Sequence, residues 1–451
     1  MRPKKLNKRG ATTVFTAIIL SSIILIECTY VTFVWDLDRR LCISRALKDQ
    51  VEVILADYDR ALFDTYGIYA FDINRVDDNV FTKVLEANGL KNGDSIYIDQ
   101  IEVMDTEALR CAITSYYAYR GGAIAIKAMI FQVSSLLDKV IDTKVTDKIK
   151  LFSSSGAAGI VANILLESSD IEEKIDSYAT EIEESLLEKG QLGLRNLQKL
   201  IDDSNDDVTS FDPGLRLTDL GFLTFKLTSL EHMIDLGKSL IAGKGDHLLL
   251  AHYAAYNFDC AVDNEVDCTI NGTLFSSIHE NNYYDAEYIL TGIDGRPGMV
   301  SVSSLIFQIM FCKYFLENYT DEGKALAYET AAILLTTVVA LISECTVDIP
   351  AEVMQMIIIA IVSVCQAAKA VNDCLKGEAL TLFEEDGMEL IKLKYRDFLF
   401  LYLCCVNDAS LSKRMLGLLT RDYGDLYTGI KLSTEYRGTT YDITRKYELY
   451  E

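Results

Sequence analysis

The sequence is poor in residues that interrupt helices and in motifs that carry chemistry. Proline occurs only four times in 451 residues, so long helices are permitted. There are four histidines, and the chain contains no HExxH pair, no Walker A loop, no GxGxxG fingerprint and no GxSxG elbow. No catalytic, cofactor-binding or metal-binding residue can therefore be nominated. We expect a protein that is not an enzyme and that uses no cofactor or metal.

Isolated polar residues do not change this expectation. His247 and His252 are five residues apart, a poor spacing for one helical face, so we interpret them as packed or surface histidines. An acidic cluster falls in one predicted loop but lacks the EF-hand pattern, so a solvated loop is the favoured interpretation over a cation site. Its members are Asp259, Asp263, Glu265 and Asp267.

The eleven cysteines are dispersed, odd in number and without a CxxC pair. This spacing argues against a zinc site, and the length of the chain argues against a small disulfide scaffold. Cys260 and Cys268 flank a short polar turn, so a local bridge and two free thiols both stay open.

Positive charge is also scarce, since the formal net charge is −24. An acidic surface repels phosphate backbones and anionic headgroups, so we expect no nucleic-acid partner and a body that does not lie flat on a membrane. No small-molecule substrate is identified either. The first ten residues are the exception, because they hold a basic cluster without any acid. The cluster consists of Arg2, Lys4, Lys5, Lys8 and Arg9.

The basic leader, residues 1–10, is followed by a long apolar run, Ala11–Val34, whose one charged side chain is Glu27. As a helix this run is about 36 Å long, enough to cross a hydrocarbon core of about 30 Å. Asp36 and Asp38 follow it, so the positive-inside rule predicts a cytoplasmic N-terminus and an extracytoplasmic body. A retained single-pass anchor in the cell membrane fits better than a cleaved signal peptide or a lipoprotein.

Glu27 has two interpretations. It is either a carboxyl near the outer interface, where burial costs little, or a polar residue that sets the register between packed membrane helices. The first is favoured, and the second makes Glu27 the candidate for helix packing.

Residues 35–105 are predicted to form a stalk and a small sheet. Apolar residues continue at helical spacing after the membrane run, which predicts one amphipathic helix to about Tyr66, ended by Gly67. Ile68–Phe71 and Ser95–Met104 have the pattern of strands.

The remainder is predicted to be helical with little β structure. Residues 106–205 form one helical region, and the polar segment 203–216 is the best candidate boundary. Residues 217–451 form a second, mostly helical region, with short strands and turns near 258–289. The fold class is therefore mainly α with small β elements (α+β).

Two apolar segments, 331–343 and 353–368, fall short of the roughly 20 residues of a membrane span, and Pro350 between them suits a turn. Core helices are the favoured interpretation, and a membrane hairpin stays open. Ile391–Val406 is predicted to be one more buried helix.

The N-terminal residues Lys8-Arg9-Gly10-Ala11-Thr12-Thr13-Val14-Phe15, followed by the apolar run, resemble the start of TadE/TadG-like pilus-assembly proteins and of pilin-like proteins. In pilins a dedicated peptidase cuts after the glycine that ends a basic leader. The resemblance implies processing between Gly10 and Ala11. Pilins usually carry glutamate five residues into the mature chain, where this sequence has Phe15.

A second resemblance covers nearly the whole chain through short scattered motifs. They look like those of an uncharacterised family of large, singly anchored proteins of Gram-positive bacteria, often found with Tad-type pilus components. The resemblance implies a location and a system rather than a reaction. The motifs are Ala56–Arg60 with Tyr66–Tyr69, Glu287–Gly292 and Lys394–Leu399.

Three functions remain open. The first is a structural component of a Tad-like pilus or secretion apparatus, with other membrane proteins of that apparatus as partners through the N-terminal helix. The second is an anchored surface-binding module for a peptide, glycan or envelope protein. The third, an extracytoplasmic hydrolase, is least favoured because no nucleophile–base set is present.

Overall fold

In the computed structural model the chain forms two compact units. Unit 1 is formed by residues up to Ala112 together with Thr420–Glu451, and unit 2 is formed by Ile113–Leu419. The described residues are 8–90, 96–117, 133–135, 138–139, 184–205, 232, 234–236, 238–239, 245–262, 269–270, 273–274, 284–342, 349–385, 388–436 and 438–447. Their secondary structure is mainly helical with small antiparallel sheets, which confirms the predicted fold class in outline.

Unit 1 begins with α1, a 49-residue helix that runs from Lys8 to Ala56. No glycine or proline interrupts the sequence from Ala11 to Ala56, so nothing breaks the backbone hydrogen bonds across the change from apolar to amphipathic sequence. The predicted continuation of the membrane helix into an amphipathic helix is confirmed to this point.

The prediction that this helix reaches Tyr66 was wrong. The chain leaves the helix after Ala56, and a new helix, α2, runs from Arg60 to Tyr66. At its start the side chain of Asp59 accepts a hydrogen bond from the backbone N–H of Leu62. Asp59 is thus an N-cap, which competes with continuation of the first helix. The predicted stop at Gly67 is confirmed, because this glycine ends α2 in the left-handed region (φ 66°).

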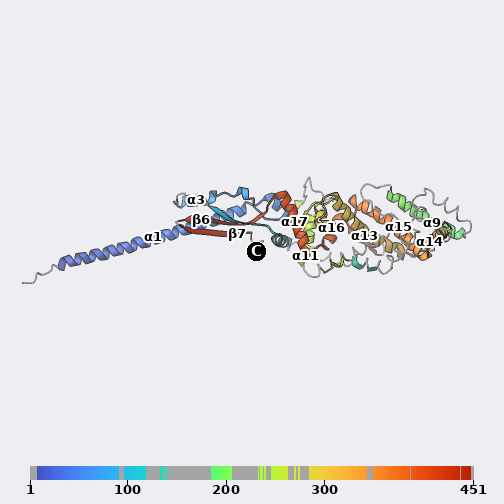
Figure 1. Ribbon diagram of the computed structural model, residues 1–451, viewed down its shortest axis with the longest axis horizontal. Coiled ribbons are helices and arrows are strands. Elements are labelled where there is room, and N and C mark those ends of the chain that lie inside the picture. Colours follow the sequence, from blue (N-terminus) through green and yellow to red (C-terminus); the bar gives the residue numbers. More distant parts are fainter. Residues whose placement is uncertain are drawn as a thin grey trace, which may run out of the picture. The chain divides into compact units, whose positions relative to one another are not determined.

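A three-stranded antiparallel sheet lies beside α1, in the order β1-β6-β7. Strand β1 (Tyr97–Val103) confirms the strand predicted for Ser95–Met104. Strands β6 (Tyr427–Tyr436) and β7 (Thr439–Lys446) form a hairpin in the region 217–451, where strands had been predicted only near 258–289. In Figure 1 this hairpin follows the C-terminal part of α1.

The strand predicted for Ile68–Phe71 was wrong. Only Phe71 in that segment pairs, through isolated bridges to Tyr58 and Tyr427. Two further helical segments complete the first part of unit 1, namely the 3-10 turn η1 (Ile73–Arg75) and α3 (Asn79–Ala87).

The core of unit 1 joins one face of α1 to the sheet and α3. Its buried members are Ile43, Ala46, Leu47, Val51, Ile54, Phe71, Phe81, Leu85, Ile430 and Leu432. Gln50 lies on the same face of α1 and is buried, and its side chain donates to the carbonyl of Asp77 (2.6 Å) and accepts from the N–H of Phe81 (2.8 Å). These two bonds attach the start of α3 to α1, because a buried amide left unpaired would be costly.

Unit 2 is built around three long apolar helices. They are α13 (Arg296–Thr320), α14 (Glu322–Ile342) and α15 (Ala351–Leu375), of 25, 21 and 25 residues. Helix α13 packs on α15, and α14 packs on α15 and on α9 (Glu184–Asn205). Pro350 directly precedes α15, and residues 343–348 of the predicted turn lie outside the described residues.

The helices α14 and α15 are longer than the apolar segments 331–343 and 353–368 from which they were predicted. The argument that these segments are too short to cross a membrane was therefore wrong, because the polar ends of the helices add the missing turns. Helix α13 lies in the region 217–451 that was predicted to be mostly helical, although it was not predicted as a separate helix.

Shorter elements lie against this three-helix core. Helix α11 (Gly245–Asn257) packs on α16 (Tyr395–Leu403), and α12 (Asp285–Thr291) packs on α13 and α16. Helices α4 (Thr106–Tyr117) and α17 (Asp408–Tyr423) carry the chain from one unit into the other.

Two small hairpins complete the described part of unit 2. Strands β2 (Thr269–Ile270) and β3 (Thr273–Leu274) pair with each other and confirm part of the β segment predicted near 258–289. The other part of that prediction was wrong, since Asp285 begins a helix.

The helix predicted for Ile391–Val406 was also wrong in its first part. Strand β4 (Leu380–Glu385) pairs with β5 (Met388–Leu393), and α16 begins only after Lys394. The carboxylate of Asp397 accepts a hydrogen bond from the backbone N–H of Lys394 (2.8 Å), which places the start of the helix there.

Several predictions fall outside the described residues. These are most of 118–183 in the helical region predicted at 106–205, and residues 206–216 of the predicted boundary. Helices α4 and α9 lie within residues 106–205 and agree with the helical region predicted there.

Helices α9 and α14 approach closely through glycine. A Cβ added to Gly193 would lie 3.2 Å from both the carbonyl oxygen of Ala327 and the Cβ of Ala331, closer than side chains normally pack. Replacing Gly193 by leucine should therefore force the two helices apart and lower the free energy of unfolding by about 1–3 kcal/mol. Denaturant unfolding of the detergent-solubilised protein, followed by circular dichroism, measures this.

Gly417 provides the matched control, because a Cβ added there meets no atom within 4 Å. Replacing this helical glycine by alanine should leave the protein as stable or stabilise it by up to about 1 kcal/mol. Equal stability of wild type and Gly193→Leu would contradict the close packing of α9 on α14.

Candidate functional site

The N-terminal half of α1 is apolar and exposed over its whole described length. Every residue from Thr13 to Trp35 is exposed, and the large apolar side chains among them are 42–68% exposed. An exposed apolar surface of this length is not stable in water. Its length and composition make α1 a candidate membrane span, and it is the first candidate functional surface.

The residues nominated from sequence all lie on this half of the helix. Gly10 and Ala11 fall in its first turns. Glu27 is exposed, about 24 Å further along the helix axis than Ala11 at 1.5 Å per residue. The structure therefore does not bring the candidate processing site and the candidate packing residue together.

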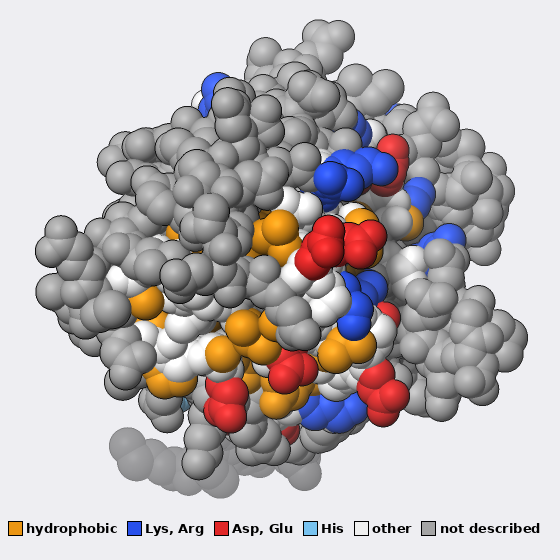
Figure 2. Space-filling model, turned by 90° about the vertical axis from the view of Figure 1, so that its right-hand side faces the viewer, with side chains coloured by type: hydrophobic (Ala, Val, Ile, Leu, Met, Phe, Trp, Pro, Cys, Tyr) orange, Lys and Arg blue, Asp and Glu red, His pale blue; other side chains and the backbone are white. Residues whose placement is uncertain are grey.

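Three more helices are long and apolar enough to span a membrane, but they are much better covered. In the most apolar stretches of α13, α14 and α15, 67%, 44% and 67% of the residues are buried inside the protein, against 0% for α1. Figure 2 shows one face of the molecule on which hydrophobic side chains lie among acidic and basic ones. By contrast, the exposed half of α1 carries a single charged side chain, Glu27, between Thr13 and Trp35.

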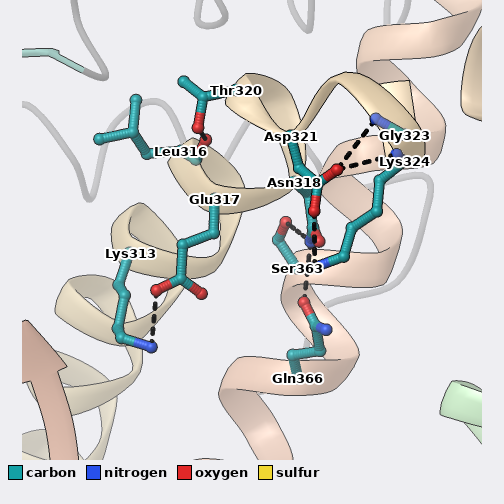
Figure 3. A network of polar contacts seen from close by, with 10 residues as sticks. All are labelled: Lys313, Leu316, Glu317, Asn318, Thr320, Asp321, Gly323, Lys324, Ser363 and Gln366. Carbon is teal, nitrogen blue, oxygen red and sulfur yellow. Dashed lines mark hydrogen bonds and ion pairs between the residues drawn. The ribbon is translucent and has the colours of Figure 1, made fainter. Parts of the chain in front are cut away.

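The contact of α13 with α15 contains a polar bridge (Figure 3). The side-chain amide of Asn318 donates to Ser363 Oγ (3.2 Å) and to Gln366 Oε1 (2.8 Å), and Ser363 donates to the carbonyl of Ile359 (2.7 Å). Because Asn318 and Ser363 are buried, sliding one helix along the other would leave these groups unpaired. The bridge therefore fixes the register of the two helices.

The turn after α13 is as short as a helix-to-helix turn can be. Asp321 alone separates α13 from α14, and its carboxylate accepts from the N–H groups of Gly323 (3.0 Å) and Lys324 (3.1 Å). Lys313 and Glu317 form an ion pair one turn earlier (2.9 Å). Asp321 thus caps α14 and fixes the start of this helix directly after the end of α13.

The second candidate site is a buried carboxyl at the junction of α12 and α16. Glu287 is fully buried, and its Oε1 accepts from the N–H of Ala261 (2.8 Å) and from the hydroxyl of Tyr395 (2.9 Å). Its Oε2 is buried and has no hydrogen-bond partner within the described part of the chain. Burial raises the pKa of Glu287 to about 7, although both hydrogen bonds and the charge of Arg396 act in the opposite direction.

Two arginines hold the backbone around this carboxyl. Arg396 is buried, and its Nη1 donates to the carbonyl of Ala255 (3.0 Å), with longer contacts to the carbonyls of Tyr256 (3.5 Å) and Phe258 (3.4 Å) at the end of α11. Arg414 donates to the carbonyls of Ile289 and Leu290 (both 2.7 Å) at the end of α12. Both guanidinium groups satisfy helix-terminal carbonyls that would otherwise be unpaired.

Gly292 is required at this helix end for two reasons. It has φ 74°, and a Cβ on it would lie 3.0 Å from the guanidinium of Arg414. The motifs Glu287–Gly292 and Lys394–Leu399, which carried the second resemblance, thus meet around one buried carboxyl. Sequence reasoning did not nominate these residues, and the only available signal was their place in those motifs.

The histidines of α11 are packed, as predicted. His247 is buried between the carboxylate of Asp408 and the carbonyl of Cys404. His252 stacks on Tyr256, and burial lowers its pKa to about 4. His232 is exposed. Among the described residues there is no group of three or more potential metal ligands.

The thiol of Cys260 donates to the carbonyl of Val262 (3.3 Å). The choice between a local bridge and two thiols stays a prediction, because it depends on Cys268. Cys268 and three residues of the acidic cluster, Asp263, Glu265 and Asp267, lie outside the described residues.

Comparison with protein families, with characterised proteins and with solved structures finds no match to this chain. The site must therefore be interpreted from its own geometry. It combines an exposed apolar helix with a protein body whose polar interior groups are used to hold helices together.

The buried carboxyl makes a prediction about pH. Because the pKa of Glu287 is raised from 4.5 to about 7, the folded state binds more protons than the unfolded state between these values. Below pH 4.5 this group makes its full contribution to stability. As the pH rises through 7 the free energy of unfolding falls by about 3 kcal/mol. Glu287→Gln, which cannot ionise but keeps an acceptor for Ala261 and Tyr395, should remove this loss.

The measurement is denaturant unfolding of both proteins at pH 5 and pH 8. His252 changes stability in the opposite direction, since its lowered pKa favours the folded state as the pH rises from 4 to 6.5. The difference between wild type and Glu287→Gln removes this contribution. If wild type and Glu287→Gln differ in free energy of unfolding by the same amount at pH 5 and at pH 8, the raised pKa of Glu287 is contradicted.

Proposed function

We propose that this chain is a non-enzymatic, membrane-anchored structural component of a Tad-like pilus or surface-assembly apparatus. The observation that carries the proposal is the dual character of α1, whose first half is exposed and apolar and whose second half packs on an antiparallel sheet. A long N-terminal helix with this division is the plan of pilin-like proteins, and it agrees with the resemblance of the sequence around Gly10.

The proposal places one helix in the membrane. The exposed stretch Thr13–Trp35 is about 33 Å long, against about 30 Å for a hydrocarbon core. The apolar stretches of α13 and α15 are mostly covered by protein, so they serve as core helices of unit 2. For 353–368, which lies in α15, the proposal chooses a core helix over a membrane hairpin.

The charges on both sides of the span support a cytoplasmic N-terminus and extracytoplasmic units. The leader is strongly basic, whereas the arginines after the span are engaged locally. Arg40 pairs with Asp36 (2.8 Å), and Arg39 lies over the ring of Trp35 (3.9 Å to its centroid). The Arg40–Asp36 pair cancels one charge of each sign, so the contrast across the span comes from the basic leader.

The mass of the N-terminus tests the proposal most directly. In protein extracted from its native membranes we expect a chain that begins at Ala11, because a pilin-type peptidase would cut after Gly10. Gly10→Leu should keep the full leader, and Thr13→Val, which leaves the glycine in place, should be processed normally. An intact leader in the wild type would overturn pilin-type assembly and favour a fixed anchor for a surface-binding module.

The exposed carboxyl in the span makes a second prediction. If Glu27 sets the register with partner helices, Glu27→Leu should reduce the amount of partner membrane protein that co-purifies from mild detergent, since the polar contact is lost. The far-UV spectrum should not change, because Glu27 is exposed and far from the core of unit 1.

Ile26→Leu is the matched control, since it changes the adjacent exposed side chain without changing polarity. Unchanged co-purification with Glu27→Leu would count against packing through this residue and would leave it as an interfacial carboxyl.

A further inference from the structure

The protein cover of α1 begins where its apolar sequence ends. All residues from Thr13 to Trp35 are exposed, and Asp36 and Arg39 are the first that are partly covered. The group that covers Arg39 is Tyr436, whose hydroxyl accepts a hydrogen bond from Arg39 Nη1 (3.2 Å). Tyr436 pairs with Thr439 as the last pair of the β6–β7 hairpin. The tip of the hairpin therefore lies at the boundary between the apolar and the amphipathic half of α1.

The other end of the hairpin is fixed to the end of the same helix. The hydroxyl of Tyr447 donates to the carbonyl of Leu55 (2.8 Å). From Arg39 to Leu55 the helix rises about 24 Å, and from Gly429 to Tyr436 the strand extends about 23 Å. These equal lengths show that the hairpin follows α1 with its tip toward the N-terminal half, as Figure 1 displays.

The residues around the tip have the chemistry of a membrane interface. Trp35 is the one tryptophan of the chain and is 61% exposed, with the guanidinium of Arg39 over its ring. Tryptophan and tyrosine prefer the headgroup level because they combine an apolar ring with a polar group. Thr439 and Thr440 at the tip are exposed and offer hydroxyl groups to phosphate and ester oxygens.

The depth of the tip follows from the length of the helix. With Thr13–Trp35 as the span, Trp35 lies at the outer edge of the hydrocarbon core. Arg39 is about 6 Å further along the axis. The headgroup region on each side is about 5–8 Å thick, so Arg39 and the Tyr436 bonded to it fall within it.

We propose that the tip of the β6–β7 hairpin, Tyr436 with Gly438–Thr440, is a second membrane contact that lies in the headgroup layer of the bilayer holding α1. This inference rests on the proposed anchoring of α1, and its partner is a lipid surface. A single helix can rotate and tilt freely in a bilayer, whereas a helix with a second contact beside it cannot. The tip thus sets the orientation in which unit 1 is held above the membrane.

The remainder of the protein has the opposite preference. The net charge of −24 is repelled by anionic lipid, so the acidic body gains nothing from lying on the surface. The contact is therefore confined to the tip, where Arg40 neutralises Asp36 and where hydroxyl groups predominate.

The single tryptophan allows the depth to be measured site by site. The full-length protein is placed in phosphatidylcholine nanodiscs that carry a nitroxide on the headgroup or at the end of the acyl chain. Wild type reports the depth of Trp35. Trp35→Phe combined with Thr440→Trp moves the reporter to the tip while keeping an aromatic ring for Arg39. Trp35→Phe combined with Thr444→Trp places it at an exposed position about 13 Å further along β7.

We expect the headgroup nitroxide to quench the fluorescence of Trp35 and of the Thr440→Trp variant, which carries the tip reporter. The emission of the Thr444→Trp variant, the second hairpin reporter, should stay nearly unchanged. Quenching of Trp35 without quenching of the tip reporter would overturn the second contact and leave the anchor in place. Quenching of both hairpin reporters would also overturn it, because the body would then lie flat. An unquenched Trp35 would instead refute the membrane anchor and with it the proposed function.

Discussion

Helix α1 is one continuous helix whose first half is exposed and whose second half is packed against protein, and the rest of unit 1 packs on the second half alone. Its first half exposes apolar side chains on every face, as only a helix covered by lipid or by other helices can. Its second half buries one face, where Leu47, Val51 and Ile54 meet the sheet and α3. The hairpin begins to cover the helix only past Trp35, so the same residues mark the end of the span and the start of the folded body.

Unit 2 uses buried polar groups to position helices that apolar contact alone would leave free to slide. Asn318 fixes α13 against α15, and Glu287 joins α12 to α16 and to the chain after α11. Each of these groups is costly to bury unpaired, so an alternative packing is penalised more strongly than the native one is favoured. The carboxyl of Glu287 carries this role only while it holds its proton, since charge on it is opposed by burial.

The elements that could be predicted from the sequence are those with a local helical or strand periodicity or a local turn signal. The apolar run, the amphipathic continuation, the strand near Tyr97 and the stop at Gly67 all follow from local periodicity or turn chemistry. The break at Asp59 was missed because an N-cap competes with a helix that is equally favourable by composition. The C-terminal strands were missed because β6 is stabilised by pairing with β1, more than 300 residues earlier. The candidate polar site could not be predicted for the same reason, since Glu287 and Tyr395 are adjacent only in the folded chain.

The discontinuity of unit 1 has a consequence for biosynthesis. Strand β6 completes the sheet on α1, yet the ribosome makes it only after the whole of unit 2. At 5–20 residues per second, roughly 15–60 s separate the synthesis of β1 from that of β6. During this interval the face of α1 around Leu47 lacks the strands that bury it in the finished protein. The nascent chain must therefore keep an aggregation-prone helix face shielded, by a chaperone or by the translocation machinery, until its last strands emerge.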